Sequence, residues 1–553
     1  MNTTRDLVRD RVVAAFAAAV EDGRLPPFPP EPPVTYEVTR PGSPGHGDYA
    51  TNAALKMAGK MGRPPRDIAA VLAAAIGSGD DLISKVDVAG PGFVNIWLAP
   101  GYVESAADSI RAAGLDYGRA PLAQSQRINV EFVSANPTGP LTVGNARGAF
   151  VGDLLCRVLE AVGHQVTREY YFNDSGAQVE KLGLTVQALK RGQPVPDDGY
   201  HGDYVGPLAE SVPADVWQKA ESEPDRTGWI LGEWASEQIR AGIEQSLANL
   251  GVRFDMWKSE SSLHTDGHVA RAIDKLRASG DVYEQDGALW FRSTAFGDDK
   301  DRVVIRSNGE PTYFASDIGY VSEKFGRGFD ELIYVWGADH HGTVARLKNA
   351  AQALGLNRDA TNVLLIAWVH FVRDGVEVSM SKRTGEFVTL DELLAEVGVD
   401  AARWFFASRA PTTGIDFDIE LAKKESSENP VYYVQYAHAR ISSILRKAAA
   451  EGLKAADSLA GGLADDPVAL GLAKDLLRLP DIVRDAAEEQ ETQSITAFAT
   501  ELATTFHAFY RDRRVVDASD PATSAYRLAL VDSTRLTLAA ALALLGISAP
   551  DSM

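Results

Sequence analysis

The spacing of hydrophobic residues changes several times along the chain, and each change marks a different kind of element. Over residues 5–22 apolar side chains recur every three or four positions, which predicts an amphipathic helix. Two more helices are expected from Tyr49 and over 66–75, and 86–98 predicts two strands joined by a Gly-Pro-Gly turn. Residues 1–105 are therefore expected to form a small α/β domain.

The middle of the chain alternates strands and helices. Residues 128–171 run strand, turn, helix, strand, which is typical of a parallel α/β sheet. Residues 175–290 are richer in charge, glycine and tryptophan and predict an insertion. Strand-like runs then return and are expected to resume the same sheet, at 302–306, 332–336 and 363–369. Residues 125–390 are therefore expected to form one Rossmann-type domain split by the insertion.

Beyond Asp391 the helical period dominates. Apolar residues at helical spacing predict helices over 432–450, 466–484, 494–515 and 525–545. A C-terminal helical bundle over 391–553 is the expected fold of this part.

Composition narrows the classes of function. With 553 residues, 45% of them hydrophobic, the chain can form several domains. Its net charge of −21 argues against a protein that coats nucleic acid nonspecifically, but leaves room for local basic patches. Cys156 is the only cysteine, which excludes an intramolecular disulfide and a cysteine-cluster zinc site, and no metal site is expected. No apolar run long enough to span a bilayer and no signal segment are expected, so a cytoplasmic protein without membrane contact is predicted.

Residues 131–148 hold the most informative pattern. A short strand breaks at Pro137, Gly139 and Pro140, and a helix begins near Gly144. Backbone N–H groups at such a turn and helix start can bind phosphate. Glu131 and Asn136, at the end of the strand, could hold a cationic ligand beside that phosphate. The alternative for Glu131 is a structural acid paired with an arginine.

A second candidate segment lies at 372–385. A hairpin turn leads into a polar loop with the adjacent cations Lys382 and Arg383. Two cations on a loop suit phosphate charge that grows in a transition state. A solvated basic loop is the alternative.

Together, the two segments resemble the paired signatures of class I aminoacyl-tRNA synthetases. Thr142-Val143-Gly144-Asn145 occupies the place of the His-x-Gly-His turn, and Ser379-Met380-Ser381-Lys382 that of the Lys-Met-Ser-Lys loop. The closer resemblance is to the arginyl-tRNA synthetases and covers essentially the whole chain. It is carried by 131–153, 168–176, 313–317, 337–342, 386–391 and 433–440.

The resemblance implies substrates and site residues. It implies L-arginine, ATP with Mg²⁺, and tRNA(Arg) as ligands, and a monomer as the usual form. Arginine would be bound by Glu131, Ser134, Asn136, Tyr313 and Asp317. ATP would be bound by Thr142, Gly144, Asn145, Asp339, His340, Met380 and Lys382, with Thr142, Asn145, Lys382 and Arg383 as catalytic groups. The tRNA would contact Phe93, Asn95, Tyr433, Tyr436 and Arg440.

From the residues alone, several of these positions have other interpretations. Tyr313 and Asp317 are four apart and could be a surface pair on a helix. Asp339 and His340 could cap the next helix. The tyrosines at 433 and 436 could belong to an aromatic core stripe.

The chain also departs from the family pattern. Both signature histidines are replaced, by Thr142 and Asn145, and the first lysine of the loop is replaced by Ser379. Two hypotheses follow. The first is a working arginyl-tRNA synthetase with an unusual phosphate site, which we prefer. The second is a paralogue with weak or no adenylation that binds arginine or tRNA.

Overall fold

The computed structural model describes residues 2–27, 36–174, 176–378 and 389–553. The chain divides into two compact units, and each is described by itself. Unit 1 consists of Met1–Pro121, Ser426–Gln490 and Ser494–Met553. Unit 2 consists of Leu122–Glu425 and Glu491–Gln493. Both ends of the chain thus contribute to one unit, and the segment 391–425 belongs to unit 2, although a boundary near 390 was expected.

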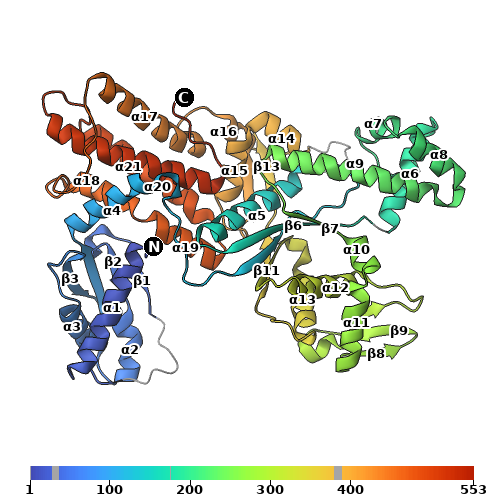
Figure 1. Cartoon of the computed structure of the whole chain (residues 1–553), viewed down its shortest axis with the longest axis horizontal. Coiled ribbons are helices and arrows are strands. Elements are labelled where there is room, and N and C mark those ends of the chain that lie inside the picture. Colours follow the sequence, from blue (N-terminus) through green and yellow to red (C-terminus); the bar gives the residue numbers. More distant parts are fainter. Residues whose placement is uncertain (1, 28–35, 175, 379–388) are drawn as a thin grey trace. The chain divides into compact units, whose positions relative to one another are not determined.

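A five-stranded parallel sheet forms the centre of unit 2 (Figure 1), in the order β12-β11-β5-β6-β7. Its strands are β5 (Arg127–Glu131), β6 (Gln165–Phe172), β7 (Met256–Ser259), β11 (Glu331–Gly337) and β12 (Thr361–Ile366). The four residues of β5 after Arg127 are all buried, as expected of a central parallel strand covered on both faces. The Rossmann-type parallel sheet predicted from the sequence is confirmed.

Helices flank this sheet. The helices that bear on the site are α5 (Val143–Ala161), α12 (Tyr313–Gly326) and α13 (His341–Ala353). Most residues of α5 are buried, which agrees with its position in the interior of the unit. Between β6 and β7 the chain forms α6 (Ala177–Lys190), α7 (Val205–Glu210), α8 (Ala214–Ser222), η3 (Pro224–Arg226) and α9 (Thr227–Asn249).

Two strands lie elsewhere than the sequence pattern predicted. β7 falls within the range expected for the insertion, 175–290, yet pairs in parallel with β6, so the insertion is not continuous. The strand β10 (Arg302–Ile305) does not resume the parallel sheet. It pairs antiparallel with β9 (Ala288–Phe291), which forms a hairpin with β8 (Val282–Gln285). Local antiparallel pairing needs only short turns, whereas a return to a parallel sheet needs a long crossover. This part also contains α10 (Glu260–Thr265), α11 (His268–Ser279) and η4 (Ser293–Phe296).

A third sheet of unit 2 carries the predicted hairpin. β13 (Val369–Arg373) and β14 (Val376–Val378) are joined by Asp374 and Gly375, both at positive φ as a tight hairpin turn requires. One short strand lies among the helices predicted after residue 391. β15 (Ile415–Asp418) pairs in parallel with β13, because its alternating apolar residues Ile415 and Phe417 are buried against that sheet. The neighbouring helices are α14 (Leu390–Val397), α15 (Val399–Ala407) and α16 (Ile419–Lys423).

The N-terminal part of unit 1 packs helices on a four-stranded antiparallel sheet of order β1-β2-β4-β3. The strands are β1 (Val38–Thr39), β2 (Tyr49–Thr51), β3 (Ile83–Ala89) and β4 (Phe93–Leu98). The other elements are α1 (Thr4–Glu21), η1 (Pro44–His46), α2 (Ala53–Met61), α3 (Pro65–Ile76), α4 (Pro100–Ala113) and η2 (Gly114–Asp116). The helix expected from Tyr49 begins at Ala53, because Tyr49 to Thr51 form β2, where Tyr49 is fully buried.

The C-terminal part of unit 1 is helical, as predicted. It contains α17 (Pro430–Ala450), α18 (Pro467–Leu476), α19 (Leu479–Glu489), α20 (Gln493–Asp512) and α21 (Pro521–Leu545). Where one helix was expected over 466–484, the chain forms α18 and α19, and Pro480 lies at the start of the second.

One of these helices corrects an expectation about membranes. By length and composition α21 could span a bilayer, with a mean hydropathy of 1.6, although no such run was expected. In the structure 72% of that stretch is buried, which identifies α21 as the core helix of the bundle.

The two chain ends in unit 1 are joined by buried and partly buried polar contacts. Tyr49 Oη donates to Asp481 Oδ2 of α19 at 2.8 Å. Arg5 of α1 forms a salt bridge with Asp485 at 2.6 Å. Glu104 of α4 accepts the backbone N–H groups of Gly461 and Leu463, each at 2.8 Å. The N-terminal sheet is thereby attached to the C-terminal helices.

Candidate active site and nucleic-acid interface

The strand order of the parallel sheet predicts where ligands gather. From β5 the chain moves outward through β6 and β7, and later returns on the other side of β5 as β11 and β12. The order reverses between β5 and β11, and open α/β sheets bind ligands beyond the carboxyl ends of the strands at such a point. Those ends are Glu131 in β5 and Gly337 in β11.

The turn directly after β5 adopts an unusual backbone. Val133 and Ser134 have φ of 68° and 45°, a region that β-branched residues rarely adopt and that is often kept at functional sites. The Ser134 hydroxyl donates to Glu131 Oε1 at 3.2 Å and accepts the backbone N–H of Tyr171 at 3.2 Å. The Tyr170 hydroxyl contacts both the N–H and the carbonyl of Ala135. Ser134 and Glu131 are therefore brought together.

Thr142 and Asn145 cap the next helix as a pair. Thr142 is the N-cap of α5, and its backbone N–H and hydroxyl both lie 3.1 Å from Asn145 Oδ1, which accepts from them. This contact uses the oxygen of the Asn145 amide and leaves its NH₂ group as the donor end. Gly144 is exposed beside them in the first turn of α5. The first helical turn thus presents N–H donors and the positive end of a helix dipole.

A buried arginine anchors the same helix. Arg147 is 1% exposed and donates to the carbonyls of Ala367 and Ala410, at 2.8 and 2.9 Å. Burial lowers the pKa of its guanidinium to about 10. The start of α5 is therefore fixed to the segments that precede β13 and β15.

The exit of the predicted Met-Ser-Lys loop lies beside Thr142. Thr389 forms an isolated β-bridge with Thr142, and Leu390 N–H donates to the carbonyl of Leu141 at 2.9 Å. Met380, Lys382 and Arg383, predicted for ATP binding or catalysis, lie outside the described residues, so their roles stay predictions.

Carboxylates gather near the end of β5. Glu131 is 4% exposed, and its Oε2 lies 2.6 Å from Nζ of the fully buried Lys324. Asp317, on α12, is half-buried. Burial raises the pKa of Asp317 to about 7, and repulsion from Glu131 and Glu260 adds to the shift.

Glu260 is the residue that the sequence analysis missed. It begins α10, is 6% exposed, and accepts the Ser316 hydroxyl at 3.4 Å. Burial raises the pKa of its carboxyl group. Glu260 lies directly after β7, and β7 is part of the parallel sheet. The carboxyl ends of the strands in that sheet meet at one edge, so this position brings Glu260 to the site.

Other predicted arginine and ATP residues lie around this edge. Tyr313 begins α12 one turn before Asp317 and is 68% exposed, so the predicted helical turn is confirmed. Asn136 is exposed and donates to Gln178 Oε1 at 3.0 Å. Asp339 and His340 are exposed in η5 (Ala338–His340), directly after β11. All of these residues stay candidates, with their ligand roles untested.

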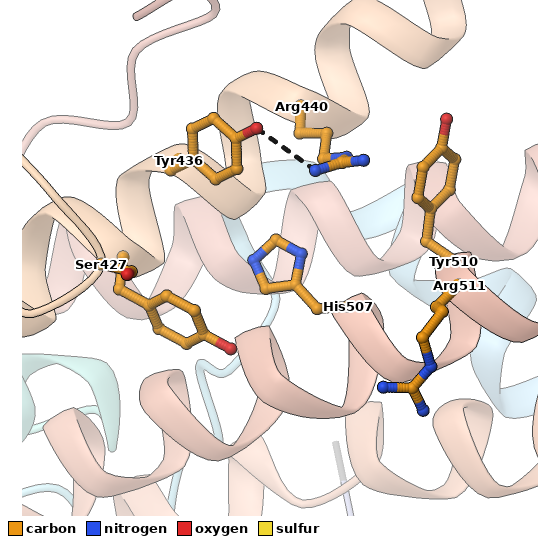
Figure 2. Close-up of a pocket in the computed structure, with 7 residues that line it drawn as sticks. Ser427, Tyr436, Arg440, His507, Tyr510 and Arg511 are labelled. Carbon is orange, nitrogen blue, oxygen red and sulfur yellow. Dashed lines mark hydrogen bonds between the residues drawn. The ribbon is translucent and has the colours of Figure 1, made fainter.

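Unit 1 contains a cavity where a nucleic-acid contact was predicted. Its volume is about 470 Å³, and it is lined by Ser427, Tyr433, Tyr436, Arg440, His507, Tyr510 and Arg511. The predicted tyrosines and Arg440 come from α17, and the histidine and remaining tyrosine come from α20. Figure 2 shows the imidazole of His507 pointing toward Tyr436 and Arg440.

The groups in this cavity contact one another. Arg440 lies 4.7 Å from the ring centre of Tyr510 and donates to Tyr436 Oη at 3.2 Å. The rings of Tyr433 and His507 are 5.1 Å apart. Burial, with a further contribution from Arg440, lowers the pKa of His507. Its Nε2 has no hydrogen-bond partner among the described residues. Aromatic rings and arginine side chains, which line this cavity, are the groups on which unstacked bases stack.

Of the two residues of the N-terminal sheet predicted to contact tRNA, one is much more exposed to solvent than the other. Phe93 is 40% exposed at the start of β4, whereas Asn95 is 5% exposed within the sheet. Lys85 of β3 lies 4.3 Å from the ring centre of Trp97. Phe93 is therefore the more accessible of the pair.

Comparisons with known proteins identify the class of fold. The family model "tRNA synthetases class I (R), catalytic domain" matches residues 110–197 and 233–411. The model "Arginyl tRNA synthetase N terminal domain" matches residues 6–98, and the model "DALR anticodon binding domain" matches 434–553. The catalytic unit is therefore that of a class I aminoacyl-tRNA synthetase.

Relatives over nearly the full length identify the family. The arginine–tRNA ligase of Bacillus licheniformis is 44% identical over 535 residues, 94% of this chain and 95% of that protein. The arginine–tRNA ligase of Bacillus subtilis is 41% identical and covers 99% of each chain. The arginyl-tRNA synthetase structure of Thermus thermophilus has a TM-score of 0.77 at 25% identity and covers 98% of this chain and 100% of its own. This chain belongs to the arginyl-tRNA synthetase family.

Proposed function

We propose that the chain attaches L-arginine to tRNA(Arg) in two steps. In the first, the arginine carboxylate attacks the α-phosphate of ATP, giving arginyl-adenylate and pyrophosphate. In the second, a terminal ribose hydroxyl of the tRNA attacks the mixed anhydride and AMP leaves. The observation that carries the proposal is that the buried carboxylates Glu131 and Glu260 and the start of α5 all lie at or after strand ends at the same edge of the parallel sheet. The protein mainly positions the reactants and neutralises charge.

The carboxylates suggest how arginine lies. Arginine carries a cation at each end, the guanidinium and the α-ammonium. Burial raises the pKa of both Asp317 and Glu260, and repulsion from Glu260 adds to the shift at Asp317, so a guanidinium, which presents five donors, would relieve that repulsion. Glu131 already holds Lys324. Its other oxygen, beside Ser134, suits the smaller α-ammonium, with Asn136 and Tyr313 fixing the orientation.

ATP would bind at the start of α5. The N–H groups near Gly144 and the amide donor of Asn145 can meet phosphate oxygens, and the Thr142 hydroxyl can reach them through water. Asp339 and His340 lie at the neighbouring strand end and would contact the nucleotide. Met380, Lys382 and Arg383 would neutralise the leaving pyrophosphate.

Mg²⁺ is expected with ATP. The described residues offer no group of three His, Cys, Asp or Glu side chains that could hold a metal ion. The ion would therefore take its ligands mainly from phosphate oxygens and water, as Mg²⁺ bound with nucleotides usually does.

The aromatic cavity of unit 1 would bind the tRNA. Tyr433 and Tyr436 would stack on unstacked anticodon bases, and Arg440 would stack or pair with them. Phe93 and Asn95 would contact a second part of the tRNA. We expect a cytoplasmic monomer, in which residues 1–105 and 391–553 serve tRNA recognition and 125–390 serves catalysis.

Charging of tRNA with labelled arginine tests this function. Purified protein should form arginyl-tRNA in the presence of ATP and Mg²⁺. Asn145→His, Thr142→His and Ser379→Lys should each keep or raise the rate, because they restore groups that commonly bind phosphate. No charging by the wild-type chain, together with retained tRNA binding, would instead support the non-adenylating paralogue. No observation favours that alternative at present.

A further inference from the structure

One face of α12 carries a row of polar residues toward the sheet. Asp317, Tyr320, Lys324 and Arg327 follow one another at helical spacing of three or four, so they share this face. The row begins with Asp317, at the proposed arginine site, and continues into the interior, where Lys324 is fully buried. The inner part contacts two strand acids, Glu131 of β5 and Glu169 of β6.

The ammonium of Lys324 forms its ion pair with Glu131, and its charge also acts on the neighbouring acid Glu169. Its Nζ lies 2.6 Å from Glu131 Oε2, and 4.3 and 4.1 Å from the ring centres of Tyr320 and Tyr334. A buried ammonium is costly unless it is paired, and the faces of two aromatic rings add a weaker attraction. The side chain of Lys324 therefore fixes one oxygen of Glu131 in place.

We propose that Lys324 is a positioning residue of the arginine site that acts through Glu131. The lysine holds Oε2, so that Oε1, which accepts from Ser134, is the oxygen that meets the substrate. Its positive charge also weakens the attraction of Glu131 for a second cation. Arginine carries a positive charge at each end. The charge of Glu131 is already balanced by Lys324, whereas Asp317 and Glu260 form no salt bridge among the described residues. This difference directs the guanidinium toward Asp317 and Glu260. This inference rests on the proposed function.

Arg327, the residue that follows the last turn of α12, provides a matched pair for comparison. Arg327 lies 2.7 Å from Glu169 Oε2, and Glu169 also accepts from Asn129 at 2.7 Å. Glu131 and Glu169 are direct neighbours in the β5–β6 register. This pair has the same chemistry of a helix cation on a buried strand acid, but neither residue is assigned to the substrate. Its loss should lower stability without changing arginine binding.

The test is a double-mutant cycle read by steady-state arginylation. Lys324→Met should raise KM for arginine by about thirtyfold, because truncating one partner of a buried charge pair is typically expensive. KM for ATP and for tRNA should stay within about twofold, as expected for distant sites. Glu131→Gln should also raise KM for arginine. Glu131→Gln combined with Lys324→Met should match Glu131→Gln alone, because Lys324 would then have nothing to position.

Each outcome separates the possibilities. Additive effects in the double variant, or an unchanged KM for arginine in Lys324→Met, would overturn the role of Lys324. If Lys324→Met does not fold, the double variant still decides, because it leaves no buried charge unpaired. Arg327→Met should lower the melting temperature while keeping KM for arginine. If Glu131→Gln itself leaves KM for arginine unchanged, the proposed arginine site fails rather than the inference about Lys324.

Discussion

The two candidate binding sites recognise charge in opposite ways. The proposed arginine site in unit 2 gathers buried or half-buried acids, and burial together with repulsion among them raises the pKa of Asp317 to about 7. The aromatic cavity in unit 1 gathers tyrosines around Arg440, and Tyr436 stays 40% exposed. In the first site the acids repel one another, and a bound cation would reduce that repulsion. In the second site the tyrosine rings are partly exposed to water and carry no charge that a ligand must neutralise.

This difference sets how sensitive each site should be to substitution. A buried carboxylate facing a cation forms a charge-assisted contact in a low dielectric, and its loss leaves the partner without compensation. Stacking on an exposed ring contributes less, and several rings share it. We therefore expect single substitutions to cost far more in the acid pocket than in the aromatic cavity.

The largest effect is expected at Asp317. Asp317→Asn should lower kcat/KM for arginine by about a thousandfold, as expected for removing a buried charge partner. The same change should raise the free energy of unfolding at pH 8 by about 1–2 kcal/mol. The pKa of Asp317 is higher in the folded state than in the unfolded state, so ionisation of this carboxyl group at pH 8 destabilises the fold. Asp317→Asn removes that cost. Initial rates of arginylation measure kcat/KM, and thermal melts measure the free energy of unfolding.

The pH dependence provides the control for this prediction. The gain in stability should shrink as the pH falls from 8 and vanish below the unfolded pKa of about 4, where the carboxyl group becomes protonated in both states. Glu310→Gln, an exposed acid just before α12, should change neither quantity. A fall in stability for Asp317→Asn at pH 8 would contradict the description of this pocket.

The next largest effect is expected at Asn145, in the proposed phosphate site at the start of α5. Asn145→Ala removes both the cap on Thr142 and the amide donor, and should lower kcat by about a hundredfold, the usual cost of losing one preorganised donor. Asn145→Asp keeps the oxygen that accepts from Thr142 but replaces the donor with a charge. If Asn145→Asp charges tRNA as fast as wild type, Asn145 serves only as a cap.

Sequence alone predicted the local features of both sites. The structure contains the predicted strand, turn and helix at 127–161 and the predicted hairpin at 369–378. These were predictable because Gly, Pro and Asp favour turns through the backbone conformation of only a few neighbouring residues. The helix face of Tyr433, Tyr436 and Arg440 was also predictable from spacing. The partners across space were not. Glu260, Lys324 and His507 join their sites through β7, α12 and α20, and no local pattern encodes those pairings.

A smaller effect is expected in the aromatic cavity. Tyr436→Ala should raise KM for tRNA by about twentyfold, within the range measured for loss of one stacking ring, and leave KM for arginine unchanged. Tyr436→Phe keeps the ring and loses only the hydroxyl that accepts from Arg440, so it should change KM for tRNA far less. Equal losses for both variants would assign the contribution to the hydroxyl instead of stacking. An effect as large as that of Asp317→Asn would abolish the contrast between the two sites.

The smallest effect is a difference in pH response between the sites. In the proposed site arginine binds ionised Asp317, so a proton should compete with the substrate below a pKa of about 7. With Glu131, Glu260 and Tyr171 as the other titratable groups facing this pocket, KM for arginine should rise about tenfold between pH 8 and pH 6. In the aromatic cavity the lowered pKa of His507, beside Arg440 and three tyrosines, keeps its imidazole neutral over most of that range. KM for tRNA should therefore change much less than KM for arginine, and Asp317→Asn should remove most of the arginine response. Parallel pH profiles for both substrates in the wild-type protein would show that neither pocket holds the charge state described for it.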